Sequence, residues 1–352
     1  MNLLTPLELG ALRLRNRIVM APMTRSRSDA AAMPNALMAE YYRQRASAGL
    51  IVSEGIAPSA NGLGYCRTPG IFTDAQVAGW RGVTDAVHAE GGCIVAQIMH
   101  VGRVASHHNK PAGSETIAPS ALAAKAKMYA DVAAMQDIDQ PLALEVAQIA
   151  EVIDEYREAT RRALEAGFDG VELHCTSGYL PAQFLSTGSN QRTDAYGGSV
   201  ENRARFALQA LQAMADVAGA DRVGMRICPG NPFNDLADAN PEETFDYLLG
   251  QAATLGLAYL HVIRMPKGPV DNLALAARHF GGRLIGNESF SLDEADAAVS
   301  AGELQAVSFG RPYIANPDLV ARHERKLPLA KFDINALYTP GPEGYISYPP
   351  AE

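Results

Sequence analysis

The sequence of 352 residues has four cysteines, one tryptophan and no long apolar run. The cysteines stand far apart and form no Cys-x-x-Cys pair, so we expect neither a disulfide framework nor a zinc or other metal site. No stretch approaches the roughly 18 uninterrupted apolar residues that a membrane-spanning helix needs. The N-terminus also lacks a charged segment followed by an apolar core. Together these absences predict a reduced, soluble, cytoplasmic protein without a membrane partner.

Positive charge is scarce as well. The net charge is −9 at pH 7, the sequence pI is about 5.4, and Lys and Arg form no block. Such a chain is poorly suited to bind nucleic acid or anionic lipid, and we expect neither as a partner. The phosphate of a small cofactor stays compatible with this composition, because it needs only local positive charge. The hydrophobic content of 47% with 20% charged residues is typical of a globular protein with a large core.

A third absence separates two α/β folds. The Gly-x-Gly-x-x-Gly turn that a doubly wound open sheet needs does not follow the first predicted strand. Apolar runs predict eight strands, at residues 18–23, 50–57, 93–100, 168–175, 222–229, 259–265, 283–287 and 306–310. Helical patterns begin at Pro34 and cover residues 74–90, 145–166, 199–217, 241–255, 271–280, 292–300 and 317–326. Eight strand–helix units favour a closed (β/α)8 TIM barrel, with residues 1–352 as one domain.

Local signals mark several helix ends. Asn-Pro pairs at residues 240–241 and 316–317 place a capping residue before a proline at the first helical position. Gly167, Gly256 and Gly302 stand where the preceding helices should end.

Three segments depart from the strand–helix alternation. Residues 7–17 alternate in polarity around a glycine, which predicts a hairpin that plugs the bottom of the barrel. Residues 101–141, after the third strand, show no clear period, and a loop of this length is more often a functional lid than a linker. The tail from Leu337 is rich in proline and glycine and is expected to dock across the barrel or against a partner subunit.

Polar residues gather where the predicted strands end, which is where barrel enzymes keep their chemistry. The residues at or near these ends, most of them polar, are Thr24, Ala57, Gln97, His100, His174, Arg226, Asn287, Gly310 and Arg311. Arg226 lies inside an apolar strand, where a guanidinium is costly unless a carboxylate or an anionic ligand meets it. An internal ion pair with Glu172, which shares the inward face with His174, is one explanation, and a bound anion is the other.

The ends of the seventh and eighth strands predict a phosphate site. Barrel enzymes commonly hold a phosphate there. Asn287 follows a glycine and Arg311 follows Gly310, so backbone N–H groups can approach an anion closely and the guanidinium can add a bidentate contact. The alternative is that these glycines only permit tight turns.

Four stretches of the chain match a known family. They are residues 14–25 (LRNRIVMAPMTR), 38–47 (MAEYYRQRAS), 189–204 (SNQRTDAYGGSVENRA) and 309–319 (FGRPYIANPDL). With these motifs the chain resembles the old yellow enzymes, which are FMN-dependent ene-reductases, over nearly its whole length. The resemblance implies a TIM barrel with FMN across its C-terminal mouth.

The resemblance also implies roles for individual residues. Cofactor binding would fall to Pro22, Met23, Thr24, Ala57, Gln97, Arg226, Asn287, Gly310 and Arg311. Tyr179 matches the proton donor, and His174 would hold the activating oxygen of the substrate. Tyr65, Met99 and Ser177 fall at substrate-facing positions. NADPH or NADH would reduce the flavin, and an electron-poor alkene, such as an unsaturated carbonyl or nitro compound, would then accept hydride and a proton. The resemblance leaves open whether the protein is a monomer or a homodimer.

Three departures from the family pattern bear on this reading. Ser177 stands where relatives carry a second His or an Asn, and the shorter hydroxyl removes one donor to the substrate oxygen unless water bridges the gap. Met99 replaces a frequent Trp and should open the pocket, and Glu288 places a carboxylate beside the predicted phosphate. Two alternatives therefore stay open: a redox-neutral isomerase or narrow-specificity reductase, and a non-catalytic flavin-binding protein.

Overall fold

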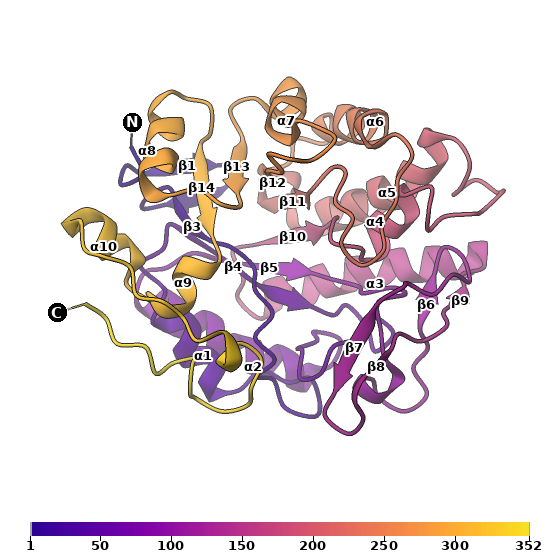
Figure 1. Cartoon of the computed structure of the whole chain (residues 1–352), viewed down its shortest axis with the longest axis horizontal. Coiled ribbons are helices and arrows are strands. Elements are labelled where there is room, and N and C mark those ends of the chain that lie inside the picture. Colours follow the sequence, from indigo (N-terminus) through magenta and orange to yellow (C-terminus); the bar gives the residue numbers. More distant parts are fainter. Residues whose placement is uncertain (1, 352) are drawn as a thin grey trace.

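Eight parallel strands close into a barrel in the computed structural model, which describes residues 2–351 (Figure 1). In chain order the strands are β3 (Ile18–Met20), β4 (Leu50–Ile56), β5 (Ile94–Ile98), β10 (Gly170–His174), β11 (Val223–Ile227), β12 (Tyr259–Ile263), β13 (Leu284–Asn287) and β14 (Ala306–Phe309). Each lies within a predicted strand but is shorter than it. The predicted (β/α)8 barrel is therefore confirmed.

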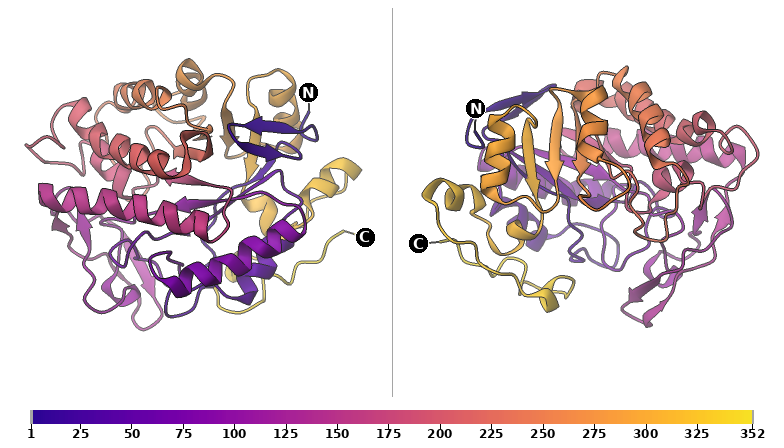
Figure 2. Two further views of the ribbon diagram at one scale, coloured as in Figure 1. Left: turned by 180° about the vertical axis from the view of Figure 1, so that it is seen from behind. Right: turned by 45° about the horizontal axis from the view of Figure 1, so that its top comes forward.

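Helices surround the barrel, as both views of Figure 2 show. Those that follow successive strands are α1 (Ala36–Arg43), α2 (Asp74–Ala89), α3 (Val146–Glu165), α5 (Val200–Ala218), α6 (Pro241–Ala253), α7 (Asn272–Phe280), α8 (Leu292–Ser300) and α10 (Leu319–Arg325). The short helices α4 (Leu180–Leu185) and α9 (Arg311–Ala315) follow β10 and β14 directly.

The predicted helix ends are confirmed except at one position. Gly167, Gly256 and Gly302 all have positive φ, and the side chain of Asn240 caps α6. The prediction that Asn316 caps a helix is wrong, because α10 begins at Leu319. The Asn316 side chain instead donates to the carbonyls of Pro312 and Ala330, so it joins two chain segments.

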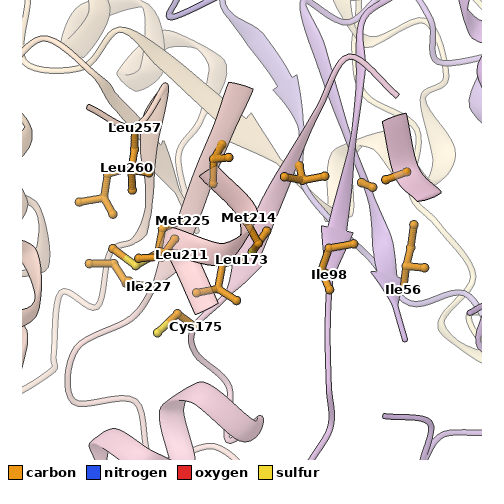
Figure 3. Packing of buried hydrophobic residues seen from close by; sticks show 14 of the residues in the cluster. Ile56, Ile98, Leu173, Cys175, Leu211, Met214, Met225, Ile227, Leu257 and Leu260 are labelled. Atoms are coloured by element: carbon orange, nitrogen blue, oxygen red, sulfur yellow. The ribbon is translucent and has the colours of Figure 1, made fainter. Parts of the chain in front are cut away.

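The barrel interior changes character along its axis. At the bottom, the hairpin of β1 (Leu7–Leu9) and β2 (Leu12–Leu14) packs its leucines against apolar side chains of the strands, as the sequence predicts for a plug. Toward the carboxyl ends the inward positions become polar. Between the barrel and the helices, Leu173 of β10 and Met225 of β11 belong to the same buried cluster as Leu211 and Met214 of α5 (Figure 3).

The segment after β5 is more ordered than the sequence predicts. It contains a hairpin of β7 (Lys127–Ala130) and β8 (Ala134–Asp137). The short strand β6 (Ile117–Ala118) pairs with β9 (Leu142–Ala143). These strands have only two to four residues, so their alternation is too brief to distinguish them from an irregular loop. The hairpin carries residues that line a cavity at the barrel mouth.

The C-terminal tail docks onto the barrel, which is the first of its two predicted positions (Figure 1). Three buried arginines hold it by its backbone: Arg25 donates to the carbonyl of Gly344 at 2.6 Å, Arg27 to that of Leu337 at 2.6 Å, and Arg45 to that of Tyr345 at 3.4 Å. Guanidinium groups that donate to several backbone carbonyls fix an irregular segment that lacks the regular backbone hydrogen bonds of a helix or sheet. The tail therefore contributes to the barrel mouth.

Candidate active site

A cavity of about 920 Å³ opens at the carboxyl ends of β3, β13 and β14. Several residues predicted to bind a cofactor line it: Pro22, Met23, Thr24, Arg226, Asn287, Gly310 and Arg311. They come from strand ends that are far apart in sequence and that ring closure brings to one rim. Ala57 and Gln97 are not among its lining residues.

Arg226 presents an unsatisfied cation to this cavity. Its Nη2 donates to Asn287 Oδ1 at 2.6 Å, whereas its buried Nη1 has no hydrogen-bond partner in residues 2–351. Burial lowers the pKa of this arginine. Because an unpaired buried guanidinium N–H is costly, this geometry favours an anionic or carbonyl acceptor in the cavity.

The alternative of an ion pair between Arg226 and Glu172 is not realised in the described structure. Glu172 instead accepts from Gln97 Nε2 at 2.7 Å and from the hydroxyl of Tyr259 at 3.0 Å. Its Oε2 also lies 2.9 Å from His261 Nδ1. The carboxylate therefore has its own partners in the polar layer beneath the cavity.

His261 and Tyr259 are functional candidates that the sequence did not single out. Both side chains point into the barrel from β12, and Nε2 of His261 lies 2.7 Å from Ser308 Oγ. Arg226 and His261 are register partners of adjacent strands. The one available signal was a histidine within an apolar strand, which a satisfied core histidine would also give.

A second cavity of about 710 Å³ adjoins the first and shares Thr24 and Tyr338 with it. Tyr65 and Tyr179 line it, together with residues of the β7–β8 hairpin. The hydroxyl of Tyr179 lies 3.2 Å from that of Tyr65. The ring of His174 lies edge-on to that of Tyr179, with centroids 4.8 Å apart. The fold therefore brings the predicted proton donor, Tyr179, together with two predicted substrate-facing residues, Tyr65 and His174.

The protonation states of this group follow from burial. Burial, and then the charge of Arg226, lower the pKa of His174 to about 3, so its imidazole is neutral at pH 7. Its buried Nδ1 lacks a hydrogen-bond partner in the described chain. Burial also raises the pKa of Tyr179 well above its usual value, so this phenol keeps its proton. The cluster thus offers uncharged hydrogen-bonding groups at pH 7.

Asn234 was missed by the sequence analysis. Its Nδ2 donates to the carbonyl of Ser177 at 2.8 Å and lies 3.4 Å from the hydroxyl of Tyr65. It follows β11 in an irregular loop, and its φ of +57° lies in the left-handed region. Nothing in the sequence distinguishes it from an ordinary turn asparagine. It ties the Ser177 turn to the tyrosine pair.

Three predicted substrate-facing residues, His174, Met99 and Ser177, lie outside the lining of both cavities. Met99 packs in an apolar cluster with Tyr179. Its Sδ lies so close to Gly55 that a Cβ added there would be only 2.4 Å away. Ser177 is half-buried, with φ of +58°. Their contact with substrate stays a prediction.

Two buried histidines should destabilise the fold in acid. Burial lowers the pKa of His100, like that of His174, to about 3. Between pH 6.5 and 3 the unfolded chain therefore binds protons at these histidines that the folded chain excludes, and at pH 5 each should cost about 2 kcal/mol relative to pH 7.5. Burial raises the pKa of Glu54 and of Glu155 to about 7, so these two carboxyls contribute in the opposite direction. Urea unfolding of the wild type and of His100→Gln at the two pH values isolates the histidine effect, because the glutamates act equally in both proteins. The same change of stability with pH in both would contradict the assignment.

The donor set fits FMN. A cavity of about 920 Å³ has an unpartnered guanidinium N–H on its wall and the apolar side chains of Pro22 and Met23. Asn287 bonds that guanidinium, and Gly310 and Arg311 also line the cavity. A flat ring with a phosphate tail needs an apolar surface, a cation near its electron-accepting edge and donors for the phosphate.

Residues 2–351 hold no group of three or more His, Cys, Asp or Glu side chains arranged to bind a metal. Within the same span, no helix is both long and apolar enough to cross a membrane.

Comparison with known proteins agrees with this geometry. A model of the NADH:flavin oxidoreductase / NADH oxidase family matches residues 2–330. The chain is 42% identical to a probable flavin mononucleotide-dependent alkene reductase of Leishmania infantum, over 99% of this chain and 97% of the relative. It is 40% identical to a flavin oxidoreductase of Emericella nidulans, over 99% and 98% of the two chains.

Solved structures give the same result. Morphinone reductase in complex with tetrahydroNAD is 44% identical, with a TM-score of 0.95 over 100% of this chain and 98% of that one. The old yellow enzyme homologue from Zymomonas mobilis is 38% identical, with a TM-score of 0.95 over 99% of both chains.

Proposed function

Because this chain belongs to the NADH:flavin oxidoreductase / NADH oxidase family, to which the old yellow enzymes belong, we propose a specific division of labour among its site residues. The chain is an FMN-dependent NAD(P)H oxidoreductase of the type that reduces activated C=C bonds. The observation that carries the proposal is the position of Tyr179 and Tyr65 in a cavity that shares Thr24 with the cavity lined by Arg226, with the His174 ring against that of Tyr179.

Bound FMN would supply the hydride-transfer chemistry that links a reduced nicotinamide to the alkene. Arg226 would hold the electron-accepting edge of the flavin ring and favour negative charge there, with a guanidinium that the fold leaves partly unpaired. Its cation also favours a neutral imidazole at His174, which donates a hydrogen bond to the carbonyl or nitro oxygen without carrying charge. Tyr179 gives its phenolic proton to the α-carbon. Tyr65 and Asn234 hold that phenol in place.

The two alternatives are a redox-neutral isomerase or narrow-specificity reductase and a non-catalytic flavin-binding protein. The comparisons favour neither. Anaerobic mixing with NADH or NADPH and then with cyclohexenone separates all three. An ene-reductase is bleached by the nicotinamide and recovers its colour with the enone. Bleaching without recovery would exclude ordinary enone reduction, and a flavin that no nicotinamide bleaches would exclude both reductive functions.

Replacing Ser177 by His should strengthen the hold on a substrate oxygen. Histidine tolerates left-handed backbone better than most residues, so the φ of +58° at this position does not forbid it. Phenols stack on oxidised flavin and give a long-wavelength band, and we expect Ser177→His to bind them about tenfold more tightly through one added hydrogen bond. Ser177→Ala is the matched control and should not gain affinity. An unchanged dissociation constant in the His variant would show that Ser177 does not limit oxygen binding.

The choice between NADH and NADPH, a cytoplasmic location, and a monomeric or homodimeric state stay predictions, as does the extent of a single domain over residues 1–352. For the nicotinamide, Lys127 at the cavity rim already pairs with Asp137 at 3.5 Å. A 2′-phosphate would have to compete with that carboxylate.

A further inference from the structure

A carboxylate already occupies the predicted phosphate end of the first cavity. Glu288 directly follows β13 and forms an ion pair with Arg311, the residue expected to hold the phosphate. The hydroxyl of Ser289 donates to the same carboxylate at 2.8 Å. All three residues line the cavity. Glu288 therefore points toward the phosphate position rather than away from it.

A neighbouring arginine, Arg264, holds the backbone of the turn that contains Glu288. Glu288 and Ser289 have φ of +76° and +57°, both in the left-handed region that non-glycine residues rarely adopt. Arg264 donates to the carbonyl of Glu288 at 2.7 Å and to that of Ser289 at 2.5 Å, and its guanidinium lies 3.6 Å from the ring centroid of Phe290. This strained backbone is fixed by its neighbours. A ligand would therefore have to displace the Glu288 side chain rather than rearrange the loop.

The charges that line the cavity make this displacement unfavourable for a phosphate. Arg25 is committed to the tail carbonyls, and Glu294 is committed to capping α8. Arg311 pairs with Glu288 through Nη2, and Arg226, at the ring end, is the lining cation with a buried unpartnered N–H in residues 2–351. A phosphate dianion would lose part of its attraction to Arg311 and would meet the negative charge of Glu288.

We propose that Glu288 competes with the cofactor phosphate for Arg311, so that this chain discriminates only weakly between FMN and riboflavin. The inference rests on the proposed function, because it places FMN in this cavity. Affinity then comes mainly from the ring end, where both flavins are alike. An exposed ion pair contributes little to folding, so the role of Glu288 is to set flavin selectivity rather than stability.

Flavin fluorescence quenching by the apoprotein at low salt measures both dissociation constants. The wild type should bind FMN within about tenfold of riboflavin, and Glu288→Gln should tighten FMN by about tenfold or more while leaving riboflavin unchanged. Glu294→Gln is the matched control, because it removes a carboxylate from the same cavity without freeing Arg311. An unchanged ratio of the two constants in Glu288→Gln, or an equal change for both flavins, would overturn the proposal.

A second substitution makes the test independent of any single variant. Arg311→Ala should weaken FMN binding by less than about threefold in the wild-type background, where Glu288 already neutralises it. In the Glu288→Gln background it should weaken FMN by about tenfold. Equal losses in both backgrounds would contradict competition. A wild type that binds FMN far more tightly than riboflavin refutes this inference alone, whereas a protein that binds neither flavin refutes the proposed function itself.

Discussion

Replacing Tyr179 by Phe should slow alkene reduction by about 10²- to 10⁴-fold, the range that a positioned general acid contributes. Reduction of the flavin by the nicotinamide should stay within about threefold of wild type, because that step needs no proton from this residue. The ring would keep its edge contact with His174 at 4.8 Å and its place in the apolar cluster with Met99. The variant should therefore fold and bind flavin normally. Stopped-flow absorbance at the flavin band resolves the two half-reactions.

Tyr65→Phe is the matched control for this prediction. It removes the hydroxyl that lies 3.2 Å from that of Tyr179 but leaves the donor itself. Its effect on alkene reduction should be about tenfold, since it loosens the position of the proton donor without removing the proton. If Tyr179→Phe slowed both half-reactions equally, Tyr179 would be part of the flavin or nicotinamide site and not the acid. If neither step slowed, the proton would come from elsewhere.

Replacing Arg226 by Met should weaken FMN binding by about 10²-fold or more. The substitution removes a buried charged donor and leaves the edge of the flavin ring that it would contact without a cation. The thermal unfolding of the apoprotein should change far less. The lost bond to Asn287 is offset by the removal of a buried N–H that has no partner in residues 2–351. Riboflavin should weaken by the same factor as FMN, because Arg226 lies at the ring end.

Arg226→Lys provides the control for Arg226→Met. It keeps the positive charge but not the fork of donors, and its affinity should fall between those of wild type and Arg226→Met. Titration of the apoprotein with each flavin gives the constants, and differential scanning fluorimetry without flavin gives the stability. Wild-type affinity in Arg226→Met would show that this cation does not meet the cofactor. A folded-state collapse in both variants would instead assign Arg226 a structural role.

The sequence was informative wherever one short segment contained the whole signal. The eight apolar runs were enough to predict the barrel, and the helix stops at Gly167, Gly256 and Gly302 were local conformational needs. Arg226 stood out because a guanidinium in an apolar strand is costly wherever it lies. The predictions failed where the local pattern did not contain the deciding interaction or was too short to read. The Asn316 side chain bonds to the distant carbonyl of Ala330, and the strands of the β7–β8 hairpin are too short to show a period.

By itself the sequence determined the barrel, the family resemblance and the residue types gathered at the strand ends, because each depends on a pattern of residues that are adjacent in the sequence. Tertiary structure alone decided which of those side chains already have partners. Glu172 pairs with His261 rather than with Arg226, and Arg311 pairs with Glu288. Such pairings join strands and loops that are distant in sequence, and ring closure fixes their separation. The free energy of a buried charge depends on that separation, so a pattern of residues adjacent in the sequence cannot predict it.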